Sequence, residues 1–239
     1  MAFGDIGGAV TELVITCQTA ASGSVAIAKG DALKLSGAYT VTNATLAEDA
    51  IFGQALGGVS DWLITIDPHL HRLASIGAVY PRSASVLHAI APVAAWIRNH
   101  VEEPLIVGPD VESRQWTEAV ADATGAPFIV MEKTRRGDRA VEVTAPDLAG
   151  VKNRTPVLLD DIISTARTMI AAMALLRENE MKPAVCVGIH GVFAEGAYED
   201  LLAAGAARVA STNTIAHLSN AIDVSDLIAE ALRERFAIP

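Results

Sequence analysis

The sequence predicts an α/β fold in which a parallel sheet flanked by helices follows a small β-rich segment. From residue 61 onward, short apolar runs alternate with amphipathic helical stretches, which is the pattern of a parallel α/β sheet. Upstream, short β-branched runs alternate with turns that contain Gly, Ser and Asn, which is typical of half-buried strands. We therefore expect two parts, residues 1–60 and 61–239.

The expected strands of the first part are short. They lie at 13–17, 25–27, 33–35 and 39–42, and a Lys29-Gly30-Asp31 turn separates two of them. A β segment of about this size leaves strand edges open and is marginal by itself. We therefore expect it to pack against a partner, and we expect the chain to form a homo-oligomer.

The second part is expected to alternate strands and helices along the chain. A strand at 63–66 ends at Asp67, and a helix at 89–100 tolerates Pro92 because proline fits the first turn. Polar residues follow several of its strands, at the edge where open α/β sheets bind ligands. The other expected strands are 105–107, 128–131, 141–143, 157–159, 185–189, 209–211 and 221–224, and the other helices are 112–123, 165–178, 197–204 and 226–235.

Composition limits the class of protein. Of 239 residues, 51% are hydrophobic and 19% charged, which is enough apolar material for a buried core. The net charge of −10 argues against general nucleic-acid binding, because that needs a basic surface. Cys17 and Cys186 give no disulfide framework. With neither a signal peptide nor an apolar run of membrane-spanning length, we expect a cytoplasmic protein without a membrane partner.

The strand at 157–159 leads into a motif that suits a sugar phosphate. It delivers two adjacent carboxylates, Asp160 and Asp161, and the small hydroxyl residues Ser164 and Thr165 then open a helix. Amides and hydroxyls at a helix N-terminus form a phosphate cradle. Paired aspartates can bind sugar hydroxyls directly or through a hydrated Mg²⁺. The alternative is a plain N-cap at Ser164 or Thr165.

Two further acidic motifs follow predicted strands. Asp67 and His69 can hold a Mg²⁺-bound phosphate, or they can form a satisfied polar cluster at the strand end. Asp110 follows a Gly-Pro turn, where it suits a pyrophosphate or metal contact or, alternatively, caps the next helix.

Cations concentrate at residues 132–139. Lysine and arginine are the residues that a transferring phosphoryl group needs, and a Gly-containing loop between two strands can close over substrate. The alternative is a solvated hairpin tip. The cations of this segment are Lys133, Arg135, Arg136 and Arg139.

In their order and separations these motifs resemble those of ribose-phosphate pyrophosphokinases, which have a type I phosphoribosyltransferase fold. The resemblance extends over about residues 61–235 and implies that fold. It also implies transfer of pyrophosphate from Mg-ATP to the 1-hydroxyl of ribose 5-phosphate, giving AMP and phosphoribosyl pyrophosphate. The matching segments are LITIDPHLHR, VGPDVESRQW, EKTRRGDRAVEV, DDIISTARTM, HGVF and STNTIAH.

The resemblance also implies roles for individual residues. Lys133 and Arg135 match the cations that stabilise the transition state, whereas Asp67, His69 and Asp110 match residues near Mg²⁺ and the phosphates. The implied ribose-phosphate loop comprises Asp160, Asp161, Ser164, Thr165, Ala166, Arg167 and Thr168.

Two positions of this loop depart from the family's usual pattern, which often has glycine there. Alanine at position 166 fits only if its φ is negative. Arg167 either adds a phosphate contact or points to solvent.

Members of this family normally have two similar α/β domains, the first of which supplies adenine-binding residues, including an Arg-Gln-Asp segment. No such segment precedes Asp61. Residues 1–60 are instead similar to head-decoration proteins of tailed phages, so the two resemblances together imply a chimera. The alternative function is therefore a catalytically inert ribose-phosphate-binding or self-assembling protein. A third possibility is a phosphoribosyltransferase that acts on a nucleobase.

Overall fold

The computed structural model describes residues 62–70, 75–78, 80, 83–136, 140–144 and 148–236. The chain divides into two compact units, His88–Asp226 and the combination of Met1–Leu87 with Leu227–Pro239. The predicted β-rich segment and its boundary near residue 60 lie outside the described residues. Across the described ranges, no helix combines the length and the apolar character needed to span a membrane.

The larger unit is built on a six-stranded sheet with the order β10-β9-β8-β7-β3-β4. Every pairing in it is parallel, so the carboxyl ends of the strands share one edge. The predicted parallel α/β sheet is therefore confirmed. The strands are β3 (Pro104–Gly108), β4 (Phe128–Val130), β7 (Thr155–Ile163), β8 (Val185–Gly191), β9 (Arg208–Thr212) and β10 (Asn220–Ile222).

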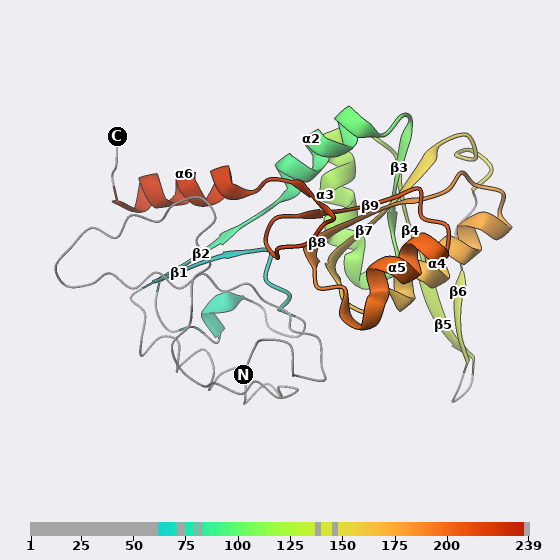
Figure 1. Cartoon of the computed structure of the whole chain (residues 1–239), viewed down its shortest axis with the longest axis horizontal. Helices are drawn as coiled ribbons and strands as arrows, with labels where there is room; N and C mark the ends of the chain where they lie inside the picture. The colour runs from blue at the N-terminus through green and yellow to red at the C-terminus, as the bar shows by residue number, and fades with distance from the viewer. Residues whose placement is uncertain are drawn as a thin grey trace. The chain divides into compact units, whose positions relative to one another are not determined.

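Helices cover both faces of this sheet. Figure 1 shows α2 with α3 on one face and α4 with α5 on the other, in agreement with their contacts. On the second face Leu105 and Leu158 of the sheet share an apolar core with Met169 and Leu176 of α4. The helical segments are α2 (Ile90–His100), η2 (Val111–Ser113), α3 (Arg114–Thr124), α4 (Arg167–Glu178), η3 (Ala194–Gly196) and α5 (Ala197–Ala203).

A separate hairpin extends the larger unit. Strands β5 (Glu132–Arg136) and β6 (Ala140–Thr144) pair antiparallel, with Lys133 opposite Val143. The strand predicted at 141–143 is confirmed, but the charged segment before it is a strand and not a loop. The charged sequence of β5 does not indicate a strand by itself. The segment is a strand because its backbone pairs with β6.

The smaller unit contains a two-stranded parallel sheet. Strands β1 (Trp62–Ile66) and β2 (Ser83–Leu87) pair, and the 3₁₀ turn η1 (Ile76–Ala78) lies between them in sequence. Helix α6 (Ser225–Phe236) ends with the Phe236 ring edge-on to Trp62, at 5.5 Å between centroids. The sequence analysis predicted β1 and α6 but did not predict β2.

Candidate functional site

Three aspartates lie near one another at the carboxyl edge of the sheet. Asp110 follows β3, and Asp160 and Asp161 lie in β7 beyond Leu158, the last β7 residue that pairs with β3. Burial, and then the charges of Asp161 and Asp110, raise the pKa of Asp160 well above its ordinary value. This cluster of negative charge therefore favours a proton, a cation or hydroxyl donors beside Asp160.

Strand β7 is longer than predicted. We expected a strand at 157–159 followed by Asp160 and Asp161, but β7 continues to Ile163 because it still pairs with β8, for example Ile162 with His190. The two aspartates consequently lie on a strand extension, not in a loop.

The phosphate-loop segment then turns into α4 without a capping side chain. The residue before the helix is Ala166, and no side chain accepts a hydrogen bond at that position. The alternative of an N-cap at Ser164 or Thr165 is therefore wrong. Ala166 has no polar side chain with which to cap α4, and the amide groups at a helix N-terminus suit an incoming anion.

Ala166 adopts a backbone conformation that the sequence analysis excluded. Its φ is 55° and its ψ is 5°, in the left-handed region, so the expectation of a negative φ is wrong. This conformation costs an alanine about 1–2 kcal/mol. Two contacts offset the cost: the methyl group is buried in the core that contains Met169, and the Ala166 carbonyl accepts a hydrogen bond from Ile170 N at 2.9 Å.

A small cavity lies along this loop. Its volume is about 120 Å³, and its walls come from the end of β7 and the first residues of α4. All the predicted ribose-phosphate residues except Asp161 line it. Its polar lining residues are Asp160, Ser164, Thr165, Arg167 and Thr168.

The segment after β8 is tied to the same loop. The backbone amides of Val192 and Phe193 both donate to the Ile163 carbonyl, at 3.0 and 2.9 Å. Position 191 must be glycine, because a Cβ there would come within 2.5 Å of the Phe193 ring and 3.1 Å of Ser211. Beyond Phe193, Glu195 forms an ion pair with Arg167, with 3.8 Å between Oε2 and Nη2.

Asp110 has a defined structural role. Its Oδ1 atom accepts hydrogen bonds from the amides of Glu112 and Ser113, at 3.2 and 3.3 Å, so Asp110 caps η2. The capping alternative is thus confirmed for Asp110, and its metal contact stays a prediction.

Gly108 allows η2 to approach the end of β3. A Cβ at this position would lie 2.5 Å from Ser113 Oγ and 2.6 Å from Thr117 Oγ1. This close packing sets where Asp110 lies at the strand end.

A buried polar network at the ends of β8 and β9 was not predicted. His190 Nδ1 lies 3.0 Å from Thr214 Oγ1, and Thr212 Oγ1 donates to the Ile189 carbonyl at 2.6 Å. The Ser211 and Ser219 hydroxyls share a hydrogen bond of 2.7 Å. The motifs HGVF and STNTIAH contain several of these residues, but only their hydroxyl content could have indicated the network. Its partners satisfy one another, so it fixes the strand ends.

The remaining predicted site residues lie elsewhere in the fold. The backbones of Lys133 and Arg135 lie in β5, and their approach to the phosphate loop stays a prediction. Asp67 and His69 follow β1 in the smaller unit, and their approach to Asp110 likewise stays a prediction. Within the described part of the chain, no three His, Cys, Asp or Glu side chains gather closely enough to hold a metal ion. Arg139 lies outside the described residues.

Comparisons with known proteins give matches that include the larger unit. The family model described as "Phosphoribosyl transferase domain" matches residues 81–226. The ribose-phosphate pyrophosphokinase of Thermoplasma acidophilum is 29% identical over 187 residues, which cover 78% of this chain and 63% of that protein. The enzyme of the same name from Pyrococcus abyssi is 33% identical over 151 residues, which cover 63% of this chain and 52% of that protein.

The fold comparison gives a similar result. The crystal structure of phosphoribosylpyrophosphate synthetase from Mycobacterium smegmatis superposes with a TM-score of 0.68 and 25% sequence identity. That match covers 80% of this chain and 64% of the other. The chain thus spans less than two thirds of the length of these relatives.

Proposed function

This chain belongs to the family of phosphoribosyl transferase domains, and from that premise we propose that it is a ribose-phosphate pyrophosphokinase. It binds ribose 5-phosphate and transfers pyrophosphate to it from Mg-ATP. The observation that carries the proposal is the arrangement at one sheet edge: three aspartates cluster there, and one of them, Asp160, lines a small cavity at the start of α4. The names of the relatives support the choice of reaction.

The phosphate of ribose 5-phosphate occupies the loop before α4. Hydroxyls of Ser164, Thr165 and Thr168 lie around that cavity, and a dianion there is stabilised by the first-turn amides of the helix. Asp160 and Asp161 accept hydrogen bonds from the ribose hydroxyls. The substrate is then held at both ends, which fixes the direction of its 1-hydroxyl.

Mg²⁺ fits the acidic cluster. This ion is usually held by one or two carboxylates together with substrate phosphates, so it does not need a cluster of three protein ligands. Asp110, Asp160 and Asp161 offer such carboxylates, and the family resemblance adds Asp67 and His69 as proposed metal contacts. When bound, Mg²⁺ neutralises charge on the pyrophosphate group.

The reaction itself needs positioning and positive charge. The 1-hydroxyl oxygen forms a bond to the β-phosphorus of ATP, the bond from that phosphorus to the α–β bridging oxygen breaks, and AMP leaves with that oxygen. The hydroxyl proton passes to solvent. Lys133 and Arg135 stabilise the negative charge that develops during this transfer, and the β5–β6 hairpin carries them.

A binding protein without catalysis is the second candidate. It needs only the loop before α4 and its cavity, and not the cations of β5. Such a protein retains the phosphate loop and binds ribose 5-phosphate, and it self-assembles. In either case we propose a cytoplasmic homo-oligomer.

A coupled AMP-release assay tests these functions. Wild-type protein should release AMP from Mg-ATP only when ribose 5-phosphate is present, and Lys133→Ala should lower the rate roughly a hundredfold. The exposed Lys182→Ala is the matched control and should keep the wild-type rate.

Calorimetry with ribose 5-phosphate separates the candidates. Binding without AMP release supports the inert protein, and the absence of both binding and AMP release refutes both functions. Release of pyrophosphate that depends on an added nucleobase would instead support a phosphoribosyltransferase.

A further inference from the structure

An ion pair bridges the two loops that meet at the proposed phosphate pocket. Arg167 is the first residue of α4 and lines the cavity, whereas Glu195 lies in η3 after β8. Arg167 Nη2 and Glu195 Oε2 are 3.8 Å apart, and their side chains are 82% and 75% exposed. A long, exposed pair of this kind is weak, so a stronger partner can replace either member.

The backbone holds Glu195 at this place. Phe193 and Glu195 both have left-handed conformations, with φ of 46° and 57°, although neither is glycine. The amides of Val192 and Phe193 bind the Ile163 carbonyl, which joins this segment to the end of β7. Conformations of this cost persist only where the surrounding structure imposes them, and they cluster at functional sites. The surrounding structure therefore holds the backbone from which the Glu195 side chain reaches Arg167.

We propose that Glu195 competes with phosphate for Arg167 and thereby sets the affinity of this loop for phosphate. In the free protein the carboxylate holds the guanidinium at the edge of the cavity. A bound phosphate takes the guanidinium from Glu195, because a phosphate forms two parallel hydrogen bonds with it and carries more charge. The inference rests on the proposed function, since it requires a phosphate at this loop.

Competition of this kind lowers the affinity for every anion that uses Arg167. The factor is the same for each of them, because the ion pair that must break is the same.

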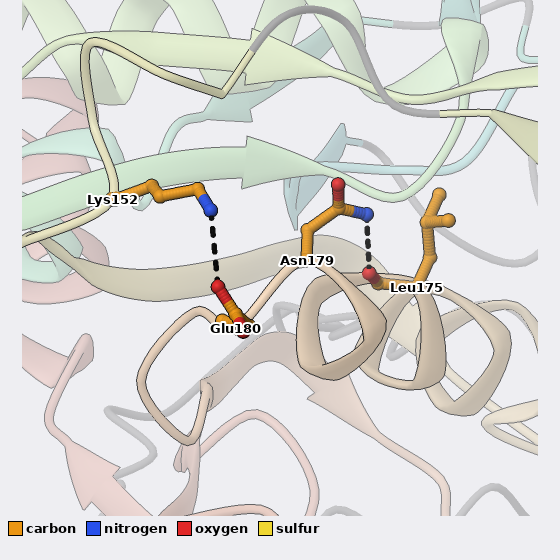
Figure 2. A network of polar contacts seen from close by, with 4 residues as sticks. All are labelled: Lys152, Leu175, Asn179 and Glu180. Carbon is orange, nitrogen blue, oxygen red and sulfur yellow. Dashed lines mark hydrogen bonds and ion pairs between the residues drawn. The ribbon is translucent and has the colours of Figure 1, made fainter.

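A second ion pair serves as the matched control. Lys152 Nζ and Glu180 Oε2 are 3.3 Å apart just beyond the other end of α4, and Figure 2 shows this pair beside the Asn179–Leu175 hydrogen bond. Glu180 is 84% exposed in its side chain, similar to Glu195. Glu180→Gln therefore removes the same charge near the opposite end of α4, at a residue that does not line the cavity.

Calorimetric titration of ribose 5-phosphate and of inorganic phosphate tests the proposal. Glu195→Gln should bind both about threefold more tightly, because an exposed ion pair of ordinary strength no longer competes. Arg167→Gln should bind roughly tenfold more weakly. Adding Glu195→Gln to Arg167→Gln should change the affinity little, and Glu180→Gln should match the wild type.

The outcomes separate this inference from the proposed function. If the wild type binds neither ligand, the phosphate site and the inference both fail. If the wild type binds but Glu195→Gln leaves the affinity unchanged or lowers it, the competition is refuted and the site stands. An equal gain from Glu195→Gln in the Arg167→Gln background also refutes it, since general charge repulsion would then explain the effect. Thermal melts confirm that each variant is folded.

Discussion

Gly108→Ala is the change for which the structure predicts the clearest loss of stability. The added Cβ would lie 2.5 Å from Ser113 Oγ, 2.6 Å from Thr117 Oγ1 and 3.3 Å from Val130 Cγ2. Neither hydroxyl can turn away without loss: Ser113 Oγ donates to the Asp110 carbonyl at 2.6 Å, and Thr117 Oγ1 donates to the Ser113 carbonyl at 2.8 Å.

The magnitude follows from these two contributions. Overpacking in a well-packed site costs about 1–3 kcal/mol, and each buried hydrogen bond that breaks costs about 1 kcal/mol. We therefore expect Gly108→Ala to lower the free energy of unfolding by about 2–4 kcal/mol. For a domain of this size that corresponds to a melting temperature lower by roughly 5–15 °C.

Calorimetric melting measures the effect, and the chain contains its own control. Gly150 has open space around the position of a Cβ, so Gly150→Ala should melt close to the wild type. Replacing Ser113 and Thr117 by alanine in the Gly108→Ala background should recover part of the loss, because the two nearest atoms are gone. If the melting temperature of Gly108→Ala equals those of Gly150→Ala and the wild type, the close approach of η2 to β3 is wrong.

Three further predictions concern single side chains. Because burial and neighbouring carboxylates raise the pKa of Asp160, its contribution to stability is present at low pH and is lost as the pH rises through the raised pKa. Asp160→Asn should remove this loss of stability, so urea unfolding at neutral pH should give the variant a larger free energy of unfolding than the wild type. Burial raises the pKa of the Cys186 thiol to about 12, so peptide mapping should find Cys186 unalkylated by iodoacetamide at pH 8 until the protein is denatured. Ala166→Gly should leave the melting temperature within about 3 °C of the wild type. The relief of about 1–2 kcal/mol of backbone strain opposes the loss of a buried methyl group and the greater disorder of the unfolded chain. A larger shift in either direction would show that one of these effects dominates.

The apolar patterns predicted the central strands and helices because burial on both faces leaves a clear trace in the sequence. The end of β7 left no such trace. Asp160 and Asp161 interrupt the apolar run, yet the strand continues because β8 lies alongside it, and that pairing depends on residues distant in the sequence. The strand β5 was missed for the same reason.

The candidate site was predicted in part. The motif at 160–168 indicated a phosphate cavity, and the structure has a cavity along that loop. The ion pair between Arg167 and Glu195 could not be predicted, because it depends on left-handed conformations at Phe193 and Glu195, which are rare for such residues. The sign of φ at Ala166 was predicted wrongly, since burial of its methyl group offsets a strain that local preference alone forbids.

The two amide hydrogen bonds to the Ile163 carbonyl have a consequence for local opening. They join the end of β7 to the segment after β8, so these bonds break together when that segment separates from β7. In amide hydrogen exchange, Val192 and Phe193 should therefore lose protection together, and a phosphate bound before α4 should slow both. A ligand bound in the cavity before α4 should therefore slow exchange in the segment after β8, although that segment does not line the cavity.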